Sequence, residues 1–454
     1  MEWKQLISNK RFGQEHKHAE RHDDRSEFKR DYDRLIFSSA FRRLQNKTQV
    51  FPLPGSIFVH NRLTHSLEVA SVGMSLGNDI SRHIIQKRPE LKDTLFEEIG
   101  TIVSAACLAH DLGNPPFGHS GEKAIQTFFS EGAGQGLKDE VSAEFWDDIT
   151  HFEGNANGFR ILTHQFKGRR QGGFVMTYPM LAAIVKYPFA SSLAGKHGKF
   201  GFFTSEAESY QKVAEELGIL RKSKPGEPLE YSRHPLVYMV EAADDICYEI
   251  MDIEDSHKLK ILSFEETANL LLGFFDEEIQ QKIRQRILDE GLTDENEQVV
   301  YMRACVIGKL ENECVNVFSE SRRGDSCRHF RGMPHRTYRR TSAPSLSEMY
   351  AGFPQENLCQ QTGSRHRTFG LQDHGYADGG LHRCRRESIP LLLQATPEKG
   401  KQPVRHRERE SRGANHGDIG LHQWYDGYLC TRHLSENQRN KSADSIETKQ
   451  TYEI

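Results

Sequence analysis

The composition of the chain changes abruptly near residue 320, and this break limits which part of the sequence can build a folded core. The last 134 residues contain 18 Arg and 9 His but only one Val, Val404, and four Ile. Their 22 Lys and Arg against 15 Asp and Glu leave a charge of +7, so the first 320 residues carry −11. So few branched apolar side chains cannot offset an ordering cost of ~1–2 kcal/mol per residue. We therefore expect the fold in residues 1–320 and a largely disordered tail over residues 321–454.

This tail differs from an ordinary disordered segment, which would contain more Lys and Glu and less Cys, Trp and Tyr. Residues 323–338, 362–379 and 423–443 can each be back-translated so that a reading frame one base further on encodes a protein-like sequence. The first of these becomes EAILAGTFEGCLIEH, with apolar residues at helical spacing. We therefore hypothesise that the reading frame changes near Ser319–Arg322 and that residues 321–454 are translated out of frame.

Apolar residues in the first 320 positions recur at helical spacing and strand-like alternation is scarce, which predicts a mainly α fold. The expected helices span residues 26–50, 61–87, 99–112, 151–164, 175–187, 206–219 and 233–252, with one or two amphipathic helices over 263–292. Proline and glycine predict a loop at 52–55, and glycines predict a mobile loop at 132–136. We expect Phe41, Leu44 and Met74 in the core.

Several classes of protein are disfavoured by the sequence. No stretch approaches the ~18–20 consecutive apolar residues that a membrane span needs. The first 30 residues contain no apolar segment of the kind found in a signal peptide. The eight Cys residues have no regular spacing, which favours reduced thiols over a disulfide framework. These features predict a cytoplasmic protein with no membrane partner.

The strongest chemical signal is the dipeptide His110-Asp111 at the end of an otherwise apolar helix. Burying such an ionisable pair is costly unless it is paired or bound to a metal. The dipeptide can supply two ligands, and His65 and Asp244 on other apolar helices are suitable further donors. Mixed imidazole and carboxylate ligands suit a site for a transition metal, or for Mg²⁺ or Mn²⁺, better than a closed thiolate zinc site.

Each of these residues alone has an ordinary explanation, since a single His on an apolar helix is more often a satisfied core residue. The run from His110 to Glu122 changes that balance, because it places two His and two acids around a Pro-Pro/Gly bend. Arg62 and Lys186 are compatible with surface charges, and Gln49 with a polar helix end. Glu153 and Asn155 are expected only to cap or brace a helix.

The segment HDLGNPPFGHSGE resembles the deoxyguanosine triphosphate triphosphohydrolases of the HD superfamily of metal-dependent phosphohydrolases. The flanking segments SSAFRRLQNKTQVFP, RLTHSLEV, HFEGNANGFRIL and EAADDICYEIMDIED also fit this family, and the similarity spans about residues 20–320. It implies an HD-domain helical bundle. The implied parts are a helical segment at 1–60 that contributes to the nucleotide pocket, an HD core at 61–260 and a helical extension at 261–320.

The resemblance also implies a set of site residues. The metal ligands would be His65, His110, Asp111 and Asp244, the catalytic pair His119 and Glu122, and the substrate-binding residues Gln49, Arg62, Lys186, Tyr187, Tyr248 and Asp252. Asp244 is preferred to Asp245 because the family's sugar-packing Tyr follows the ligand by four residues, as Tyr248 does. Gln49 and Asp252 would hold the sugar 3′-hydroxyl, and Arg62, Lys186 and Tyr187 the phosphates.

The implied reaction is hydrolysis of a deoxynucleoside triphosphate, with dGTP expected from the family, to the deoxynucleoside and intact triphosphate. A divalent metal ion, Mg²⁺ or Mn²⁺, would activate a water molecule that attacks the α-phosphorus. His119 would stabilise charge or protonate the leaving oxygen, and Glu122 would set its tautomer. Tyr248 against the sugar would disfavour a 2′-hydroxyl.

The resemblance further implies single-stranded DNA or a nucleotide as effector, and a homo-oligomer if the C-terminal segments are intact. Those segments help to complete the nucleotide pocket in the family, so an altered tail would impair activity. Two other functions remain open. The first is another HD-type nucleotidase or phosphodiesterase with the same ligands. The second is a catalytically impaired nucleotide- or nucleic-acid-binding protein, whose basic stretches would be Arg339–Arg340 and Arg405–Arg409.

Overall fold

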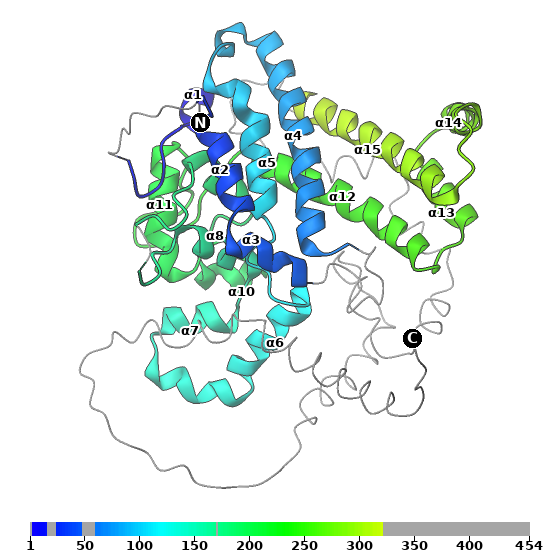
Figure 1. Cartoon of the computed structure of the whole chain (residues 1–454). Helices are drawn as coiled ribbons and strands as arrows, with labels where there is room; N and C mark the ends of the chain where they lie inside the picture. Colours follow the sequence, from blue (N-terminus) through cyan, green and yellow to red (C-terminus); the bar gives the residue numbers. More distant parts are fainter. Residues whose placement is uncertain (1, 16–23, 48–59, 169–170, 321–454) are drawn as a thin grey trace, which may run out of the picture. The chain divides into compact units, whose positions relative to one another are not determined.

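The computed structural model describes residues 2–15, 24–47, 60–168 and 171–320, all of which belong to one compact unit (Figure 1). The regular structure in these ranges is helical apart from isolated β-bridges, which confirms the mainly α prediction. The predicted loop at 52–55 and the predicted tail at 321–454 lie outside the described residues. No described helix is both long enough and apolar enough to cross a membrane.

The α-helices are α1 (Trp3–Leu6), α2 (Glu27–Ile36), α3 (Ser39–Arg43), α4 (Arg62–Lys87), α5 (Ile99–Ala109), α6 (Gly118–Ser130), α7 (Ala143–Thr150), α8 (Gly154–Thr163), α9 (Tyr178–Ile184), α10 (Ala194–His197), α11 (Ala207–Glu216), α12 (Val237–Lys258), α13 (Phe264–Leu272), α14 (Glu277–Asp289) and α15 (Glu295–Glu320). The 3₁₀-helices are η1 (Leu44–Asn46), η2 (Pro89–Leu91), η3 (Leu95–Glu98), η4 (Ala133–Glu140), η5 (Ser191–Leu193) and η6 (Thr204–Glu206).

The centre of the fold is the pair α4 and α5, which lie side by side (Figure 1). Their backbones approach closely at two glycines, because a Cβ atom built on Gly77 would lie 2.6 Å from the Cα atom of Gly100. One turn later on α5, the Ser104 hydroxyl donates at 2.9 Å to the carbonyl of Ala70, which comes before Gly77 on α4. The helices are therefore antiparallel, and the start of α4 meets the end of α5.

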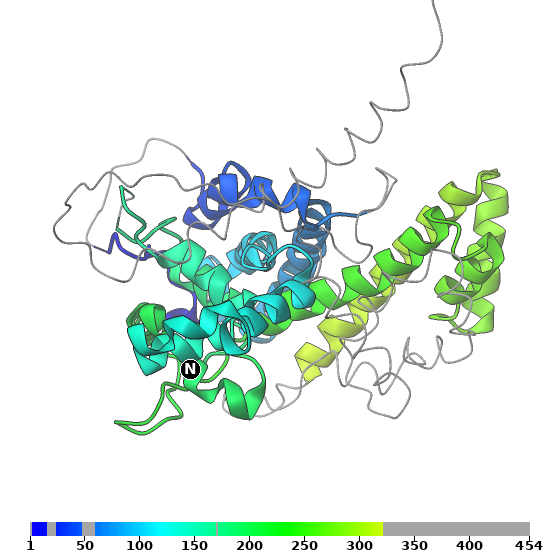
Figure 2. The ribbon, with the colours of Figure 1, turned by 90° about the horizontal axis from the view of Figure 1, so that it is seen from below.

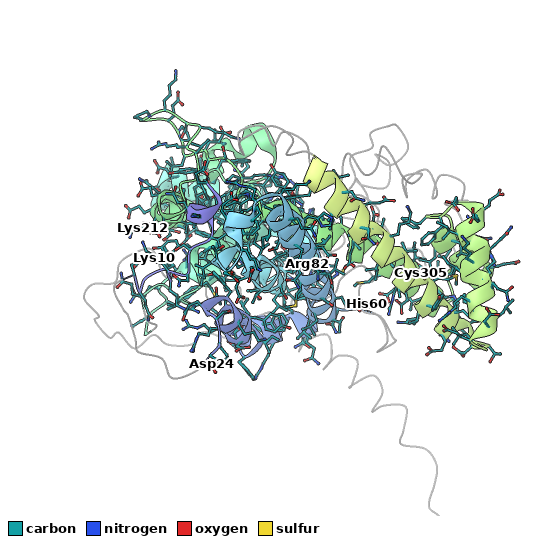
Figure 3. All side chains as sticks on the ribbon, turned by 90° about the horizontal axis from the view of Figure 1, so that it is seen from above. Lys10, Asp24, His60, Arg82, Lys212 and Cys305 are labelled. Carbon is teal, nitrogen blue, oxygen red and sulfur yellow. The ribbon has the colours of Figure 1, made fainter. Side chains whose placement is uncertain are left out.

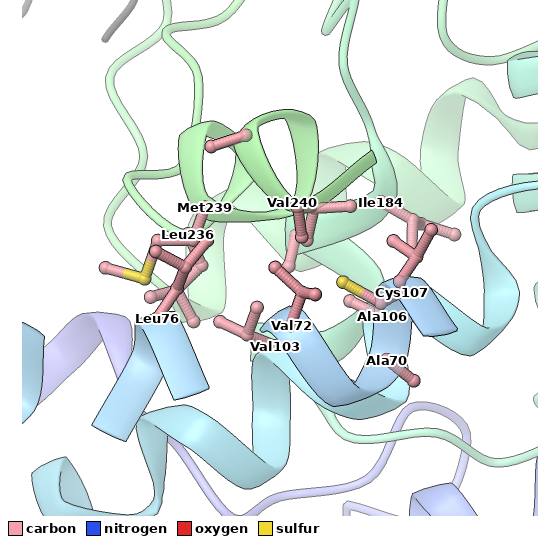
Figure 4. Close-up of a cluster of buried hydrophobic side chains, with 14 of the residues drawn as sticks. Ala70, Val72, Leu76, Val103, Ala106, Cys107, Ile184, Leu236, Met239 and Val240 are labelled. Carbon is pink, nitrogen blue, oxygen red and sulfur yellow. The ribbon is translucent and has the colours of Figure 1, made fainter. Parts of the chain in front are cut away.

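Helix α5 lies inside the molecule, since every one of its residues except Thr101 is buried. Its neighbours in contact are α2, α4, α9 and α12. Figure 4 shows part of this core, where Val72 of α4, Val103 of α5 and Val240 of α12 lie together. Because each fully buried aliphatic side chain contributes ~1.5–3 kcal/mol, this packing fixes where the polar end of α5 lies.

A buried histidine joins the N-terminal segment to the start of α12. His234 is fully buried, its Nε2 lies 3.2 Å from the Leu6 carbonyl oxygen of α1, and its Nδ1 accepts the Leu236 N–H at 3.2 Å. Both ring nitrogens are therefore satisfied in a neutral imidazole that donates from Nε2.

Helices α13 and α14 lie at the end of α12 that is distant from α5 (Figure 2).

The structure shows a helix within each expected range and corrects some details. The range 26–50 contains α2, α3 and η1 instead of one helix, and its last three residues lie outside the described part of the chain. Helix α5 ends at Ala109 rather than at residue 112, because the following residues form tight turns before the Pro115-Pro116 pair. The predicted mobile loop at 132–136 is wrong, since η4 covers most of it. Phe41 and Leu44 are buried as predicted, whereas Met74 is 36% exposed.

Candidate metal centre and its surroundings

The four predicted metal ligands, His65, His110, Asp111 and Asp244, lie together and are called the four-residue cluster below. His65 comes from the first turns of α4, His110 and Asp111 follow α5, and Asp244 lies on α12. The Oδ1 atom of Asp244 is 3.0 Å from Nε2 of His65 and 3.4 Å from Nε2 of His110. Possible ligand atoms of His65, His110 and Asp111 all lie within 4.8 Å of one another. Three distant parts of the sequence thus place imidazole nitrogens and carboxylate oxygens around one point.

The donor chemistry of this cluster fits a divalent cation. Nδ1 of His110 donates to the Cys107 carbonyl oxygen at 2.6 Å, which leaves Nε2 as the ring atom that faces the carboxylates. A hydrogen bond on the second ring nitrogen is the usual support for a metal-binding histidine. Asp244 keeps 32% of its side chain exposed although His65 is buried, so the cluster is open on one side. Two imidazoles and two carboxylates form a donor set that suits Mn²⁺ and other divalent ions.

Charge is distributed in this cluster so that both carboxyl groups are anionic. Burial acts to raise the pKa of Asp111, but the Arg62 guanidinium and the two imidazoles outweigh burial and lower it. Burial likewise opposes ionisation of Asp244, yet the nearby His110 and His65 hold its pKa well below the usual range. The same carboxylates outweigh the effect of burial on His110 and raise its pKa to about 9. The cluster therefore holds a concentrated negative charge that is balanced by nearby cationic groups.

Arg62 is part of this centre and is not an ordinary surface charge. Its side chain is buried, and Nη1 donates to Oδ2 of Asp111 at 2.6 Å. Its Nη2 atom also lies 2.7 Å from where a Cβ on Gly118 would be, and Gly118 has a φ of +53°. Only glycine fits there without strain, so the guanidinium can lie between Asp111 and the start of α6.

The predicted catalytic pair lies on that helix. Glu122 is buried, and its Oε1 atom accepts the Gly154 N–H of α8 at 2.8 Å. Its Oε2 atom lies 3.7 Å from Nδ1 of His119, whose side chain is 55% exposed. Lys199 donates to Nε2 of His119 at 3.1 Å and forms an ion pair with Glu153 at 3.1 Å. An exposed imidazole is thus backed by a buried carboxylate and flanked by an ammonium group.

Lys199 was not among the predicted site residues. Burial opposes its charge, but Glu153 and Glu122 outweigh that effect and raise its pKa, so it is a cation at neutral pH. Glu153 caps α8 as expected, because its side chain accepts the Asn155 N–H at 2.7 Å. It also positions Lys199, a role that the sequence reasoning did not assign.

The predicted phosphate-contacting residues Lys186 and Tyr187 follow α9. Nζ of Lys186 is 3.1 Å from Oε1 of Glu241 and 5.9 Å from the centre of the Tyr187 ring. Arg233, which was also missed, forms an ion pair with Glu241 at 3.0 Å and lies 5.8 Å from the same ring. Burial opposes the charge of Lys186, but Glu241 outweighs it and raises the pKa further above neutrality. Two cations therefore share one buried carboxylate three residues before Asp244.

The remaining predicted residues lie further along α12. Tyr248 and Asp252 follow Asp244 at intervals of four residues, which places them on one side of the helix. Burial, Asp255 and Glu249 raise the pKa of Asp252 well above its usual value. His60, labelled in Figure 3, joins this region to the start of α4 through its Nδ1, which is 2.7 Å from Oδ1 of Asp255. Gln49 lies outside the described residues.

Comparison with known proteins agrees with this arrangement. Residues 62–168 match the HD domain family. A deoxyguanosinetriphosphate triphosphohydrolase-like protein of Pseudomonas aeruginosa is 39% identical over 367 residues, which cover 77% of this chain and 80% of the relative. A protein of the same name from Synechocystis is 41% identical over 330 residues, or 70% and 72% of the two chains.

A deoxyguanosinetriphosphate triphosphohydrolase of Yersinia enterocolitica is 31% identical over 367 residues, covering 71% of this chain and 70% of the relative. These similarities extend well beyond the HD domain itself and include the region of α12 that contributes Asp244. The resemblance inferred from the sequence motifs is confirmed, and the chain belongs to the deoxyguanosinetriphosphate triphosphohydrolase family of the HD superfamily.

Proposed function

We propose that the protein hydrolyses deoxynucleoside triphosphates, with dGTP as the first candidate, to the deoxynucleoside and intact inorganic triphosphate. The observation that carries this proposal is the convergence of the four-residue cluster beside His119 and Glu122. The names of the relatives supply the candidate substrate. The cationic side chains of Arg62 and Lys186 near the cluster support a polyanionic ligand.

In this proposal His65, His110, Asp111 and Asp244 hold a divalent cation, most simply Mg²⁺ or Mn²⁺. Bound there, the cation polarises a phosphoryl oxygen and lowers the pKa of water. Arg62 keeps one oxygen of Asp111 occupied by a hydrogen bond at 2.6 Å and so restricts its orientation.

His119 is the group that exchanges a proton with the substrate. Glu122 faces its Nδ1 atom at 3.7 Å, so Nε2 is the ring atom directed away from the protein carboxylate. Because Gly154 donates to Glu122 at 2.8 Å, the carboxylate is held in place behind the ring. His119 can then protonate the leaving 5′-oxygen while Glu122 stabilises the imidazolium.

The triphosphate is held by cations that already lie around the centre. Lys199 donates to Nε2 of His119 at 3.1 Å, and when its ammonium group turns to a phosphate oxygen it frees Nε2 for proton transfer. Lys186 and Arg233 share Glu241, and either can turn to a phosphate while the other keeps the carboxylate paired. These contacts bind the substrate by charge, and Tyr248 supplies the preference for deoxyribose.

The direct test is product analysis for the four deoxynucleoside triphosphates with Mg²⁺ or Mn²⁺, using chromatography that separates triphosphate from pyrophosphate and phosphate. Asp244→Asn should reduce turnover by at least about a hundredfold, because it removes a charged ligand next to both imidazoles. Asp245→Asn is the matched control. It makes the same substitution one residue further along α12, at a carboxyl group that is not part of the four-residue cluster.

Release of a deoxynucleoside together with intact triphosphate supports the proposal. Release of monophosphate or of single phosphates instead indicates the nucleotidase or phosphodiesterase alternative. Nucleotide binding without turnover indicates the catalytically impaired binding protein. Equal turnover by Asp244→Asn and the parent protein contradicts the assigned site.

A further inference from the structure

The turn that follows His110-Asp111 presents three successive backbone carbonyls, and two side chains from elsewhere in the chain bind all of them. Nζ of Lys47 donates to the carbonyl oxygen of Asn114 at 2.5 Å and lies 3.4 Å from that of Leu112. Nδ2 of Asn157 donates to the carbonyl oxygen of Gly113 at 2.8 Å. Carbonyls at the end of a helix that lack backbone partners are costly to bury, so these donors determine the path of the turn.

The two donors belong to structural elements that define the rest of the site. Lys47 directly follows η1, and its own carbonyl accepts the Arg62 N–H at 3.1 Å, at the first residue of α4. It therefore connects the start of α4 with the turn after α5. Asn157 is buried on α8, whose first residue, Gly154, donates to Glu122.

Close packing makes this arrangement specific. A Cβ atom on Gly113 would lie 2.0 Å from the Gly154 carbonyl oxygen and 2.1 Å from the Gly158 nitrogen. The turn therefore lies directly against the backbone of α8, and Asn157 binds it from the same helix. A small displacement of the turn is opposed by both repulsion from α8 and the loss of the Asn157 hydrogen bond.

This turn also orients the carboxylate of Asp111 in the four-residue cluster. The Asn114 side-chain amide donates to Oδ1 of Asp111, while Arg62 donates to Oδ2. Lys47 binds the carbonyl of the same Asn114 and so fixes the residue that holds Oδ1. Both oxygens of Asp111 are thus oriented by residues whose positions depend on Lys47.

We infer that Lys47 and Asn157 are positioning residues that set the orientation of Asp111 and thereby the affinity of the four-residue cluster for a divalent cation. This inference rests on the proposed metal site. Neither side chain is itself a ligand, since each donates its hydrogen bonds to backbone carbonyls. Loss of an outer partner of this kind typically weakens metal binding by about 10- to 100-fold.

The test is a Mn²⁺ titration of the full chain. Binding is measured as the decrease of the electron paramagnetic resonance signal of free Mn²⁺. Lys47→Met removes the donor but keeps the length of the side chain, and Asn157→Leu removes the amide at similar volume. Each should raise the Mn²⁺ dissociation constant by at least about tenfold. Lys47→Arg retains a cationic donor and should stay within about threefold of the parent. The double variant should show less than the product of the single effects, because both residues act on one turn.

Two control variants remove comparable groups far from the turn. Lys282→Met removes a lysine of α14 that pairs with Glu278 at 2.6 Å. Asn312→Leu removes an amide of α15 that donates to the Gly308 carbonyl at 2.8 Å. Both should bind Mn²⁺ like the parent. Thermal unfolding in the absence of metal shows whether each variant is folded. If Lys47→Met does not fold, Lys47→Gln replaces it, because the shorter glutamine cannot reach both carbonyls.

Parent-like Mn²⁺ affinity in folded Lys47 and Asn157 variants overturns the inference, whereas the proposed function stands if the parent binds Mn²⁺ and hydrolyses nucleotide. Weakening of equal size in the two control variants also overturns it. A parent protein that binds no Mn²⁺ overturns both the inference and the proposed metal site. Weakening confined to the Lys47 and Asn157 variants, with rescue by Lys47→Arg, supports the positioning role.

Discussion

Acidification should weaken the attachment of α1 to the start of α12 through His234. Burial lowers the pKa of His234 to about 4, and the hydrogen bond to the Leu6 carbonyl compensates only in part. A proton added to Nδ1 would face the Leu236 N–H, which lies 3.2 Å away and now donates to that atom. The protonated form is therefore disfavoured by both desolvation and the loss of an acceptor.

The size of the effect follows from the difference between the folded and unfolded pKa values. The unfolded value is 6.5, and the folded value is about 4. Since one pKa unit corresponds to about 1.36 kcal/mol, the linked change in the free energy of unfolding is about 3 kcal/mol. Because the folded pKa is depressed, this stability is fully present above pH 6.5, decreases as the pH falls and is lost completely below about pH 4.

Urea unfolding between pH 7.5 and 4, followed by far-ultraviolet circular dichroism, measures this dependence. His234→Gln keeps an amide donor near the position of Nε2 but does not titrate, so its stability should decrease less steeply with falling pH. His83→Gln replaces an exposed histidine of α4 and should retain the slope of the parent. Equal pH slopes for the parent and His234→Gln would refute the reasoning.

Three further predictions address packing, specificity and the coding sequence. Gly77→Ala should destabilise the protein by about 1–3 kcal/mol in urea unfolding, because the added methyl meets the backbone of Gly100, whereas Gly308→Ala on α15 meets open space and should stabilise by about 1 kcal/mol. A stability loss in Gly308→Ala of the same size as in Gly77→Ala would contradict this. Tyr248→Ala should raise turnover of ribonucleotides relative to deoxyribonucleotides, and an unchanged ratio of GTP to dGTP hydrolysis would argue against its role. The coding DNA beyond Ser319–Arg322 should be open and protein-like one base further on; frequent stop codons in that frame would refute the frame hypothesis.

The members of the four-residue cluster could be identified from the sequence, because each is a polar residue that interrupts the apolar pattern of a helix or ends it. His65 and Asp244 are polar residues on helices whose apolar periodicity is otherwise clear, and His110-Asp111 ends a helix that is almost entirely buried. Such interruptions are costly unless they serve a site, so they are visible without a structure. The family motif then indicated which of the interruptions belong together.

The residues that were missed lack this contrast. Lys199 lies between helices, in a segment where a lysine is unremarkable, and only the fold brings it to His119. Lys47 and Asn157 act through backbone carbonyls, which have no signature in the side-chain sequence. Helix α15 was not among the helices expected from periodicity, although the resemblance implied a helical extension over residues 261–320. Local periodicity identifies helices, but contacts between distant turns depend on tertiary packing.

The contact between α8 and the site has a mechanical consequence. The first residue of α8 binds Glu122 and lies against Gly113, so Glu122 and the turn after His110-Asp111 are both attached to one helix. Glu122 and this turn cannot move apart unless α8 itself moves. For the proposed substrate, the groups best able to exchange partners during binding are Lys186, Arg233 and Tyr187, which are joined by ion pairs and cation–ring contacts.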